Sequence, residues 1–223
     1  DGAVEMAAPG VRVLDLFSGI GGFALGLEMA GFPPPAAFCE NDAYCQRVLA
    51  KHWPDVPCFP DVRELNAKVL ADAESVRWGE GEPIPGGGKS GDGPNRPPRP
   101  TGDGEARRPT PAIDLITGGF PCQPFSLAGR RGGAADDRHL WPEMYRLVDE
   151  LRPAWMLGEN VAGLVTMGLD AVLSDLEDSG YTTRTFAIPA AGVDAPHRRE
   201  RLWILAHNDS QQRRPNQRKP DAG

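Results

Sequence analysis

Short apolar runs alternate with segments of helical periodicity along most of the chain. Residues 11–17 (VRVLDLF) form an apolar run that ends in glycine-rich sequence, and residues 23–30 then continue with apolar positions at helical spacing. The same two patterns predict strands at 36–39, 113–117, 155–157, 181–187 and 202–206, and helices at 43–52, 62–73, 143–151 and 169–179. We therefore expect an α/β fold with an open, mainly parallel, Rossmann-like sheet of about six strands and helices on both faces. The last two strands are the candidates for antiparallel pairing.

The composition changes abruptly between residues 79 and 111, where 9 Gly and 8 Pro fill 17 of 33 positions. A segment with so little apolar surface cannot offset the entropy that ordering would cost. We expect a disordered insertion that loops out of one domain, residues 1–206, and a linker between two domains is the alternative. Residues 207–223 carry Arg and Lys among Gln, Asn and Pro without apolar periodicity, which predicts a disordered basic tail.

Charge and hydropathy argue against two classes of protein. The chain has 24 Lys and Arg against 31 Asp and Glu, a net charge of −7. It therefore lacks the overall basic field of an autonomous, tight nucleic-acid binder, and any such contact must be local. No apolar run approaches the roughly 18 residues of a membrane-spanning helix. The four cysteines fit neither a metal motif nor a secreted disulfide framework, so we expect free thiols, a cytoplasmic location and no metal.

The turn GIGGFA at residues 19–24 follows the first predicted strand and matches the dinucleotide-binding pattern GxGxxA. Glu40 follows Gly19 by 21 residues, at the end of the second strand, where a carboxylate can accept hydrogen bonds from both hydroxyls of a ribose. Asp61 lies where a third strand would end; it suits the exocyclic amine of adenine, or equally caps the helix from Val62. These features indicate a nucleoside ligand. NAD and S-adenosylmethionine both fit, and a purely structural glycine turn is the alternative.

Cys122 lies just past the predicted strand 113–117, between Pro121 and Pro124, which stiffen the loop. A thiol held out toward the ligand crevice is a candidate nucleophile where positive charge lowers its pKa. Five arginines are available for this purpose: Arg130, Arg131, Arg198, Arg199 and Arg201. A small buried cysteine is the alternative, and the flanking prolines argue against it.

Glu159 and Asn160 come just past the predicted strand 155–157. A carboxyl in an apolar setting has a raised proton affinity and can donate a proton to a ring nitrogen, and a neighbouring carboxamide can support that geometry. Together the two side chains suit the edge of a nucleobase. A surface Glu beside a helix-capping Asn is the alternative.

In these residues the chain resembles the cytosine-C5 DNA methyltransferases. Six motifs of that family occur in the family's order: DLFSGIGGF, CEND, DV, GGFPCQPFS, GENV and HRRERLWIL. The resemblance covers residues 11–206 apart from the insertion, and it implies a Rossmann-like S-adenosylmethionine-dependent methyltransferase fold with residues 1–206 as the catalytic domain. It also implies methyl transfer from S-adenosylmethionine to C5 of a cytosine flipped out of double-stranded DNA, with S-adenosylhomocysteine as product. A bacterial or phage-type enzyme of a restriction–modification system is the expected setting.

The same resemblance implies a role for each site residue. The expected cofactor contacts are Phe17, Ile20, Gly22, Glu40, Asn41, Asp61, Val62 and Leu140. The expected catalytic residues are Cys122 as the nucleophile that adds to C6, Glu159 as the group that holds N3 and the amino group of the base, and Arg199 as their support. The expected substrate-binding residues are Pro121, Asn160 and Arg201, with Asn160 ordering the Pro121 loop. Residues 127–138, which include three glycines, are expected to close over DNA.

Two departures from the family pattern limit this interpretation. His197 stands where the family usually has Gln, and no DNA-reading domain or closing motif is recognisable after Ala206. We therefore expect a truncated chain, or one half of a split enzyme whose second polypeptide supplies those parts, and the DNA target sequence is unreadable. A tRNA cytosine-C5 methyltransferase of the same architecture is the nearest alternative. An NAD-dependent oxidoreductase leaves FPCQPFS, GENV and HRRER without a role, and a silent nucleic-acid-binding relic requires a broken site that the motifs do not show.

Overall fold

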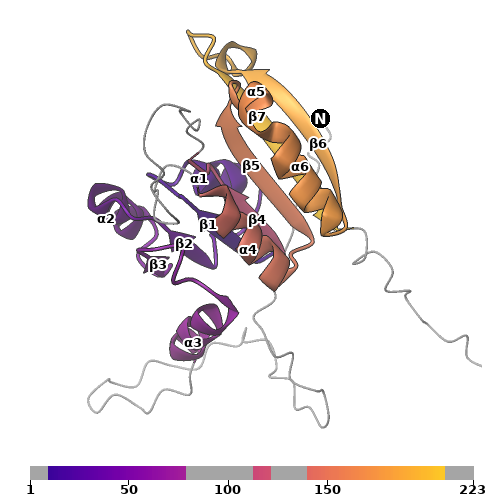
Figure 1. Ribbon diagram of the computed structural model, residues 1–223. Helices are drawn as coiled ribbons and strands as arrows, with labels where there is room; N and C mark the ends of the chain where they lie inside the picture. The colour runs from indigo at the N-terminus through magenta and orange to yellow at the C-terminus, as the bar shows by residue number, and fades with distance from the viewer. Residues whose placement is uncertain (1–9, 79–112, 122–139, 209–223) are drawn as a thin grey trace, which may run out of the picture.

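The computed structural model describes residues 10–78, 113–121 and 140–208 (Figure 1). One sheet contains seven strands in these residues: β1 (Val13–Leu16), β2 (Ala37–Cys39), β3 (Cys58–Phe59), β4 (Leu115–Gly118), β5 (Trp155–Val161), β6 (Tyr181–Pro189) and β7 (Glu200–Asn208). The helices described are α1 (Gly22–Met29), α2 (Ala43–His52), α3 (Ala67–Trp78), α4 (Trp141–Leu151), α5 (Leu164–Met167), α6 (Leu169–Asp178) and the 3-10 helix η1 (Ala190–Val193). None of these helices has the length and apolar character needed to cross a membrane.

The strands are ordered β3-β2-β1-β4-β5-β7-β6 across the sheet. The first five strands in this order run parallel to one another, whereas β7 is antiparallel to both of its neighbours. The chain therefore passes from β5 to the far edge of the sheet, forms β6, and returns as β7 between them. This arrangement confirms the predicted open, mainly parallel α/β sheet and the antiparallel pairing of its last two strands.

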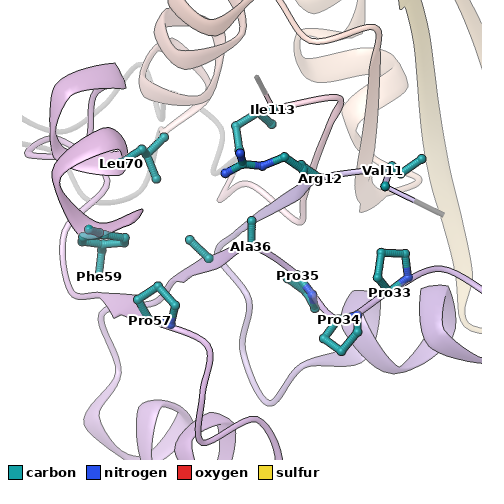
Figure 2. A pocket seen from close by; sticks show the side chains of 13 residues that line it. Val11, Arg12, Pro33, Pro34, Pro35, Ala36, Pro57, Phe59, Leu70 and Ile113 are labelled. Atoms are coloured by element: carbon teal, nitrogen blue, oxygen red, sulfur yellow. The ribbon is translucent and has the colours of Figure 1, made fainter. Parts of the chain in front are cut away.

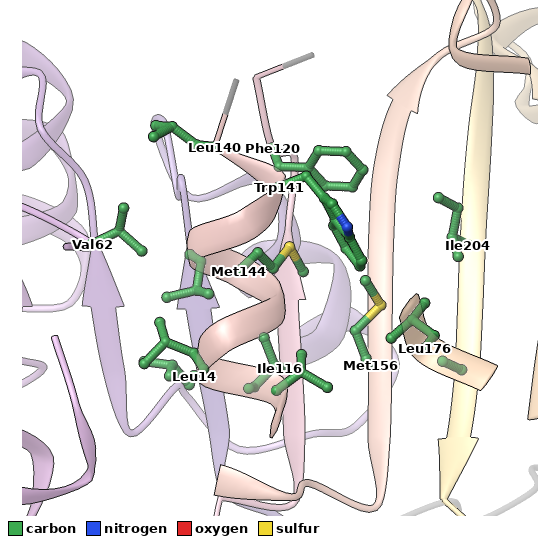
Figure 3. Close-up of a cluster of buried hydrophobic side chains, with 14 of the residues drawn as sticks. Leu14, Val62, Ile116, Phe120, Leu140, Trp141, Met144, Met156, Leu176 and Ile204 are labelled. Carbon is green, nitrogen blue, oxygen red and sulfur yellow. The ribbon is translucent and has the colours of Figure 1, made fainter. Parts of the chain in front are cut away.

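The main hydrophobic core lies between the sheet and helices α4 and α6, which Figures 1 and 3 show against the same face. Strand residues that are fully buried there include Leu14, Ile116, Met156 and Ile204. Helix α4 contributes residues spaced by three or four positions, as expected for one apolar face: Trp141, Met144, Leu147 and Val148. Each fully buried side chain of this size stabilises the fold by about 1.5–3 kcal/mol. The central strands are therefore a rigid support for the loops at their ends.

A smaller cluster covers the opposite face of β1 and β2. Ala24 of α1, Phe38 of β2 and Leu49 of α2 form it, and the Trp53 ring packs against Phe38 with the ring centroids 5.5 Å apart. A side chain at Gly21, which has φ 91°, would run into the Trp53 ring. The turn before α1 therefore needs glycine at this position both for its backbone conformation and for the packing of α1 on α2.

A cavity of about 490 Å³ lies at the amino ends of the strands (Figure 2). Its lining includes Val11, Arg12, Pro34, Leu70 and Ile113. None of the site residues predicted from the sequence lines it. The candidate active site is at the other end of the sheet.

The helix predicted at residues 62–73 begins only at Ala67, so that prediction is wrong at its start. Asp61 accepts a hydrogen bond on Oδ1 from the backbone N–H of Arg63 at 2.9 Å, and Asn66 Oδ1 accepts one from the N–H of Val69 at 2.9 Å. Short polar side chains compete in this way with helical bonding and favour turns and helix starts. Asn66, and not Asp61, therefore caps this helix.

Two strand boundaries also differ from the prediction. The strand predicted at 155–157 extends to Val161, because β7 pairs with it along its whole length, so Glu159 and Asn160 lie within β5. The last strand extends beyond residue 206: the N–H of Asn208 donates to the Ala154 carbonyl at 2.9 Å, and Asn208 is buried. His207 and Asn208 are thus not part of a disordered tail. Residues 209–223 and the insertion at 79–111 lie outside the described residues.

Candidate active site

The carboxyl ends of β1, β2, β4 and β5 meet at one edge of the sheet. Leu16 pairs with Cys39 on one side and with Gly118 on the other, and Gly118 in turn pairs with Gly158. The next residue of each strand or loop therefore lies at the same edge: Phe17, Glu40, Gly119 and Glu159. Ligands of open parallel sheets bind beyond this edge. The fold thus brings residues of the predicted cofactor and base sites together.

The loop from β1 to α1 is a tight turn with several residues in the left-handed region. Phe17 has φ 53° and Gly19 has φ 54°. The Ser18 hydroxyl donates to the Asp15 carbonyl at 2.7 Å, and the N–H of Gly21 donates to the Ser18 carbonyl at 2.9 Å. A non-glycine residue at positive φ is strained, and strain of this kind is common where backbone approaches a ligand. Ile20, at the tip of the turn, is exposed.

Glu40 links the end of β2 to this turn. Its Oε2 accepts a hydrogen bond from the N–H of Gly19 at 2.7 Å, and its Oε1 accepts one from the N–H of Asp42 at 2.8 Å. The side chain is buried, while Asn41 beside it is exposed. Each carboxylate oxygen has a second lone pair, so Glu40 can hold the turn and still accept bonds from a ligand.

Asp61 and Val62 follow β3 at the outer end of the same edge. Arg63 Nη1 lies 3.7 Å from Asp61 Oδ2, and the Asp61 side chain is 38% exposed. Val62 is buried in the main core. An exposed carboxylate on a turn whose neighbour is anchored in the core is well placed to contact a ligand.

Glu159 lies at the base end of the site, where Arg201 on the neighbouring strand holds it. Arg201 Nε lies 2.6 Å from Glu159 Oε1, and the two side chains are 25% and 26% exposed. Burial raises the pKa of the Glu159 carboxyl above its ordinary value, and the positive charges of Arg201 and Arg199 oppose that rise. A carboxyl whose pKa is raised keeps its proton to higher pH than an ordinary glutamate does, which makes Glu159 a candidate proton donor.

Asn160 holds the peptide that leads into the thiol loop. Its side-chain amide donates to the Phe120 carbonyl at 2.8 Å, and its Oδ1 accepts from the N–H of Val161 at 2.9 Å. The N–H of Leu140, at the start of α4, donates to the Pro121 carbonyl at 3.2 Å. Pro121 is therefore fixed from two directions. Neither the surface position for Glu159 nor the helix cap for Asn160 that was considered as an alternative is observed.

Several predicted site residues lie outside this arrangement. Cys122 and the loop at 127–138 lie outside the described residues, as do Arg130 and Arg131. His197 and Arg199 are exposed in the segment between η1 and β7, and of the two it is Arg199 whose charge acts on Glu159. Among the residues that the structure describes, no group of three or more His, Cys, Asp or Glu is placed to hold a metal ion.

Sequence reasoning missed two features of the site. Asp15 is fully buried in β1, where its Oδ1 accepts a hydrogen bond from the Thr117 hydroxyl at 2.7 Å. Burial raises the pKa of Asp15 to about 7. Gly119 is the second feature: a Cβ built there would lie 3.1 Å from Glu159 Oε2. An acidic residue inside the apolar run VLDL was the available signal for Asp15, whereas the contact of Gly119 depends on tertiary structure.

Comparison with known proteins agrees with these motifs. The model of the C-5 cytosine-specific DNA methylase family matches residues 11–77 and 95–222. The chain belongs to this family. It is 28% identical over 210 residues to the Type II methyltransferase M.AquIA of Picosynechococcus sp., covering 88% of this chain and 71% of that protein. It is 33% identical over 210 residues to M.PspPI of Psychrobacter sp., covering 90% of this chain but only 41% of that protein.

Solved structures give the same fold. A Spodoptera frugiperda DNMT2 structure superposes with a TM-score of 0.65 at 18% sequence identity, and the match covers 94% of this chain and 54% of that one. The chain thus spans about half of that structure and about two fifths of M.PspPI. The comparisons therefore assign the family and the fold to these residues.

Proposed function

We propose that this chain carries the catalytic machinery of a DNA (cytosine-5-)-methyltransferase, which moves a methyl group from S-adenosylmethionine to C5 of a cytosine flipped out of duplex DNA. Family membership supports this reaction class. The observation that carries the proposal is the environment of Glu159. It is a half-buried carboxyl with a raised pKa, held by Arg201, and β5 lies next to β4, the strand that leads to Cys122. A proton-donating carboxyl near a thiol is what activation of cytosine requires.

The proposed chemistry starts from the weak nucleophilicity of C5. The Cys122 thiolate forms a bond to C6 while Glu159 gives its proton to N3, which turns the ring into an enamine. C5 then takes the methyl group. Water takes the C5 proton, the C6–sulfur bond breaks to release the Cys122 thiolate, and the N3 proton returns to Glu159. The base must first leave the stack, at a cost of a few kcal/mol that contacts in the pocket repay.

Four residues support the reacting groups in this proposal. Asn160 and Leu140 hold the backbone at Phe120 and Pro121, directly before Cys122. Arg201 orients the Glu159 carboxyl through the 2.6 Å ion pair. Arg199 adds positive charge near Glu159, which favours the thiolate form of a neighbouring cysteine. Pro121, Asn160 and Arg201 are also proposed to contact the substrate.

The residues at the cofactor end fit S-adenosylmethionine. Glu40 is aimed at the turn by its bond to the N–H of Gly19, and the space in which a Cβ at Gly19 or Gly22 would lie is open. We assign Glu40 to the ribose, Asp61 and Val62 to the adenine, and the remaining contacts to Phe17, Ile20, Gly22, Asn41 and Leu140. When bound, S-adenosylmethionine supplies the methyl group and leaves as S-adenosylhomocysteine. No role for a metal is proposed.

Duplex DNA is the proposed substrate, and a net charge of −7 means that affinity for it depends on local contacts. A second polypeptide with the DNA-reading domain and the closing motifs is proposed as a partner that supplies such contacts. The proposed setting is the cytoplasm, with association to the nucleoid when DNA is bound.

Methyl transfer to two nucleic acids tests the proposal. The purified chain is incubated with tritiated S-adenosylmethionine and either mixed-sequence duplex DNA or tRNA, with and without a candidate second subunit. Incorporation into duplex DNA that Cys122→Ala and Glu159→Gln both abolish would support the proposal. Incorporation into tRNA alone would replace it with the tRNA cytosine-C5 methyltransferase considered above.

A further inference from the structure

Arg146 on α4 reaches across to the turn that follows Asp61. Its Nη2 donates to the Val62 carbonyl at 2.9 Å and to the Leu65 carbonyl at 3.0 Å, over sequence separations of 84 and 81 residues. Carbonyl groups at turns are costly to leave unpaired when they are partly buried. One guanidinium therefore satisfies two carbonyls of the same turn.

Two acidic residues of α4 keep this guanidinium in place. Arg146 Nε lies 2.9 Å from Glu143 Oε2, and Arg146 Nη1 lies 3.4 Å from Glu150 Oε2. The other oxygen of Glu150 accepts a hydrogen bond from the N–H of Ala67, the first residue of α3, at 2.9 Å. Helix α4 thus holds both the turn at residues 61–66 and the start of the helix after it.

The sheet alone holds this turn weakly. β3 lies at the edge of the sheet and has only two residues, both of which pair with β2. Short edge strands contribute little to order beyond their own ends. Val62 and Leu65 anchor the turn in the core, where they are buried, but apolar contacts do not fix the direction of a peptide group. The N–H groups of residues 63–65 donate back to Asp61 and Val62 within the turn, and the hydrogen bonds that tie the turn to the rest of the fold include those from α4.

We propose that Arg146 is a positioning residue for adenine recognition, which sets the turn so that Asp61 and Val62 face the adenine of the cofactor. This inference rests on the proposed function, because it assumes that the cofactor carries adenosine and that its adenine lies at Asp61. Arg146 acts through the turn and does not touch the ligand. Replacing Arg146 should therefore weaken the contacts to the adenine edge and leave those to the ribose and the methyl group unchanged.

Calorimetric binding of two ligands tests this role. S-adenosylhomocysteine carries the exocyclic amine from which Asp61 is proposed to accept a hydrogen bond. S-inosylhomocysteine has an oxygen in place of that amine. For the wild-type chain we expect S-adenosylhomocysteine to bind about tenfold more tightly, since one hydrogen bond to a charged group is at stake. Arg146→Gln should weaken S-adenosylhomocysteine about tenfold and S-inosylhomocysteine less than about threefold, so that the preference nearly disappears.

Two further variants separate positioning from general stability. Arg146→Lys keeps a charged donor and should recover part of the preference. Arg152→Gln is the matched control, because Arg152 at the end of α4 also donates to a distant carbonyl, that of Ser179 at 2.6 Å, but on the other side of the helix from the turn. It should lower the melting temperature and leave the ligand preference unchanged. If Arg146→Gln does not fold, the affinities of Arg146→Lys for the two ligands are compared with those of the wild-type chain instead.

The possible results are distinguishable. Equal weakening of both ligands by Arg146→Gln, or no change in either, would overturn the positioning role. A wild-type chain that binds both ligands equally would overturn it as well, because Asp61 would then not read the amine. A wild-type chain that binds neither ligand would instead overturn the assigned cofactor, and with it the proposed function.

Discussion

The carboxylate of Glu159 occupies the space beside Gly119, so that a Cβ at residue 119 would lie 3.1 Å from Glu159 Oε2. The other carboxylate oxygen is held by Arg201 at 2.6 Å. A side chain at residue 119 would therefore displace the Glu159 carboxyl by a few tenths of an ångström and disturb its ion pair with Arg201. The absence of a side chain at Gly119 is part of what sets the position of the carboxyl.

Gly119→Ala should lower kcat for methyl transfer by about 3- to 10-fold, because the Cβ would displace the Glu159 carboxyl by a few tenths of an ångström and a misplacement of about 1 Å costs about 100-fold. Binding of S-adenosylhomocysteine should change little. Gly26→Ala is the matched control: a Cβ at this helical position meets nothing within 4 Å, and the change should stabilise the chain by about 0.5–1 kcal/mol. Full activity in Gly119→Ala would show that the Glu159 position is not critical.

Arg201→Ala should move the alkaline limb of the pH–rate profile to higher pH. Glu159 must carry a proton to act as an acid, so activity is lost as pH rises through its pKa. The positive charge of Arg201 lowers that pKa, and removing it lets burial raise the pKa further. The rate at the optimum should also fall, because the carboxyl loses its partner. Arg184→Ala, at an exposed site on β6, is the control. If the alkaline limb of the pH–rate profile stays in place or moves to lower pH in Arg201→Ala, the assigned role is contradicted.

Asp15→Asn should change how stability depends on pH. Burial raises the pKa of Asp15 in the folded chain to about 7, well above its value of roughly 3.9 in an unfolded chain. The folded state therefore binds this proton more tightly, and its contribution is fully present below about pH 4 and lost as pH rises to about 7. From pH 5 to pH 8 the wild-type chain should lose about 2–3 kcal/mol of unfolding free energy that Asp15→Asn retains. Denaturant unfolding curves at both pH values measure this, and equal losses in both proteins would show that Asp15 does not titrate in this range.

The strand–helix–strand unit that brings Glu40 to the turn at Gly19 could be predicted from local sequence, because it is set by spacing along the chain. The 21 residues between Gly19 and Glu40 span one strand–helix–strand unit, and the structure closes that distance with a direct hydrogen bond. The turn at Asp61 was less predictable. There, an Asx turn and a separate helix cap at Asn66 replace the continuous helix that apolar spacing favours.

Features that depend on tertiary contacts could not be read from the sequence. The insertion of β7 between β5 and β6 is one example, because local sequence does not specify the order of strands in a sheet. The bonds of Arg146 to a turn more than 80 residues away are another. Asn160 shows an intermediate case: its link to the Pro121 loop was expected from resemblance, and its bond to the Phe120 carbonyl now supplies a physical basis for that expectation.

Glu40→Ala should weaken binding of S-adenosylhomocysteine by about 10- to 100-fold, because the variant loses charge-assisted bonds to the ribose and the bond that holds the turn at Gly19. Once the cofactor is saturating, kcat should be reduced much less than affinity. Glu28→Ala on α1, which loses a bond to the Trp53 ring nitrogen, is the matched control and should affect stability but not affinity. An unchanged dissociation constant for Glu40→Ala would contradict the ribose assignment.

The central claim is that Cys122 forms a covalent bond to the target base with Glu159 as the proton donor, and trapping on duplex DNA that contains 5-fluorocytosine tests it most directly. The fluorine at C5 cannot leave as a proton does, so the adduct persists after methyl transfer and is visible as a protein–DNA band on a denaturing gel. With S-adenosylmethionine and any required second subunit, the wild-type chain should form this band, Cys122→Ala should form none, and Glu159→Gln should form it far more slowly. A stable adduct with Cys122→Ala, or none with the wild-type chain under conditions where it methylates DNA, would contradict the claim.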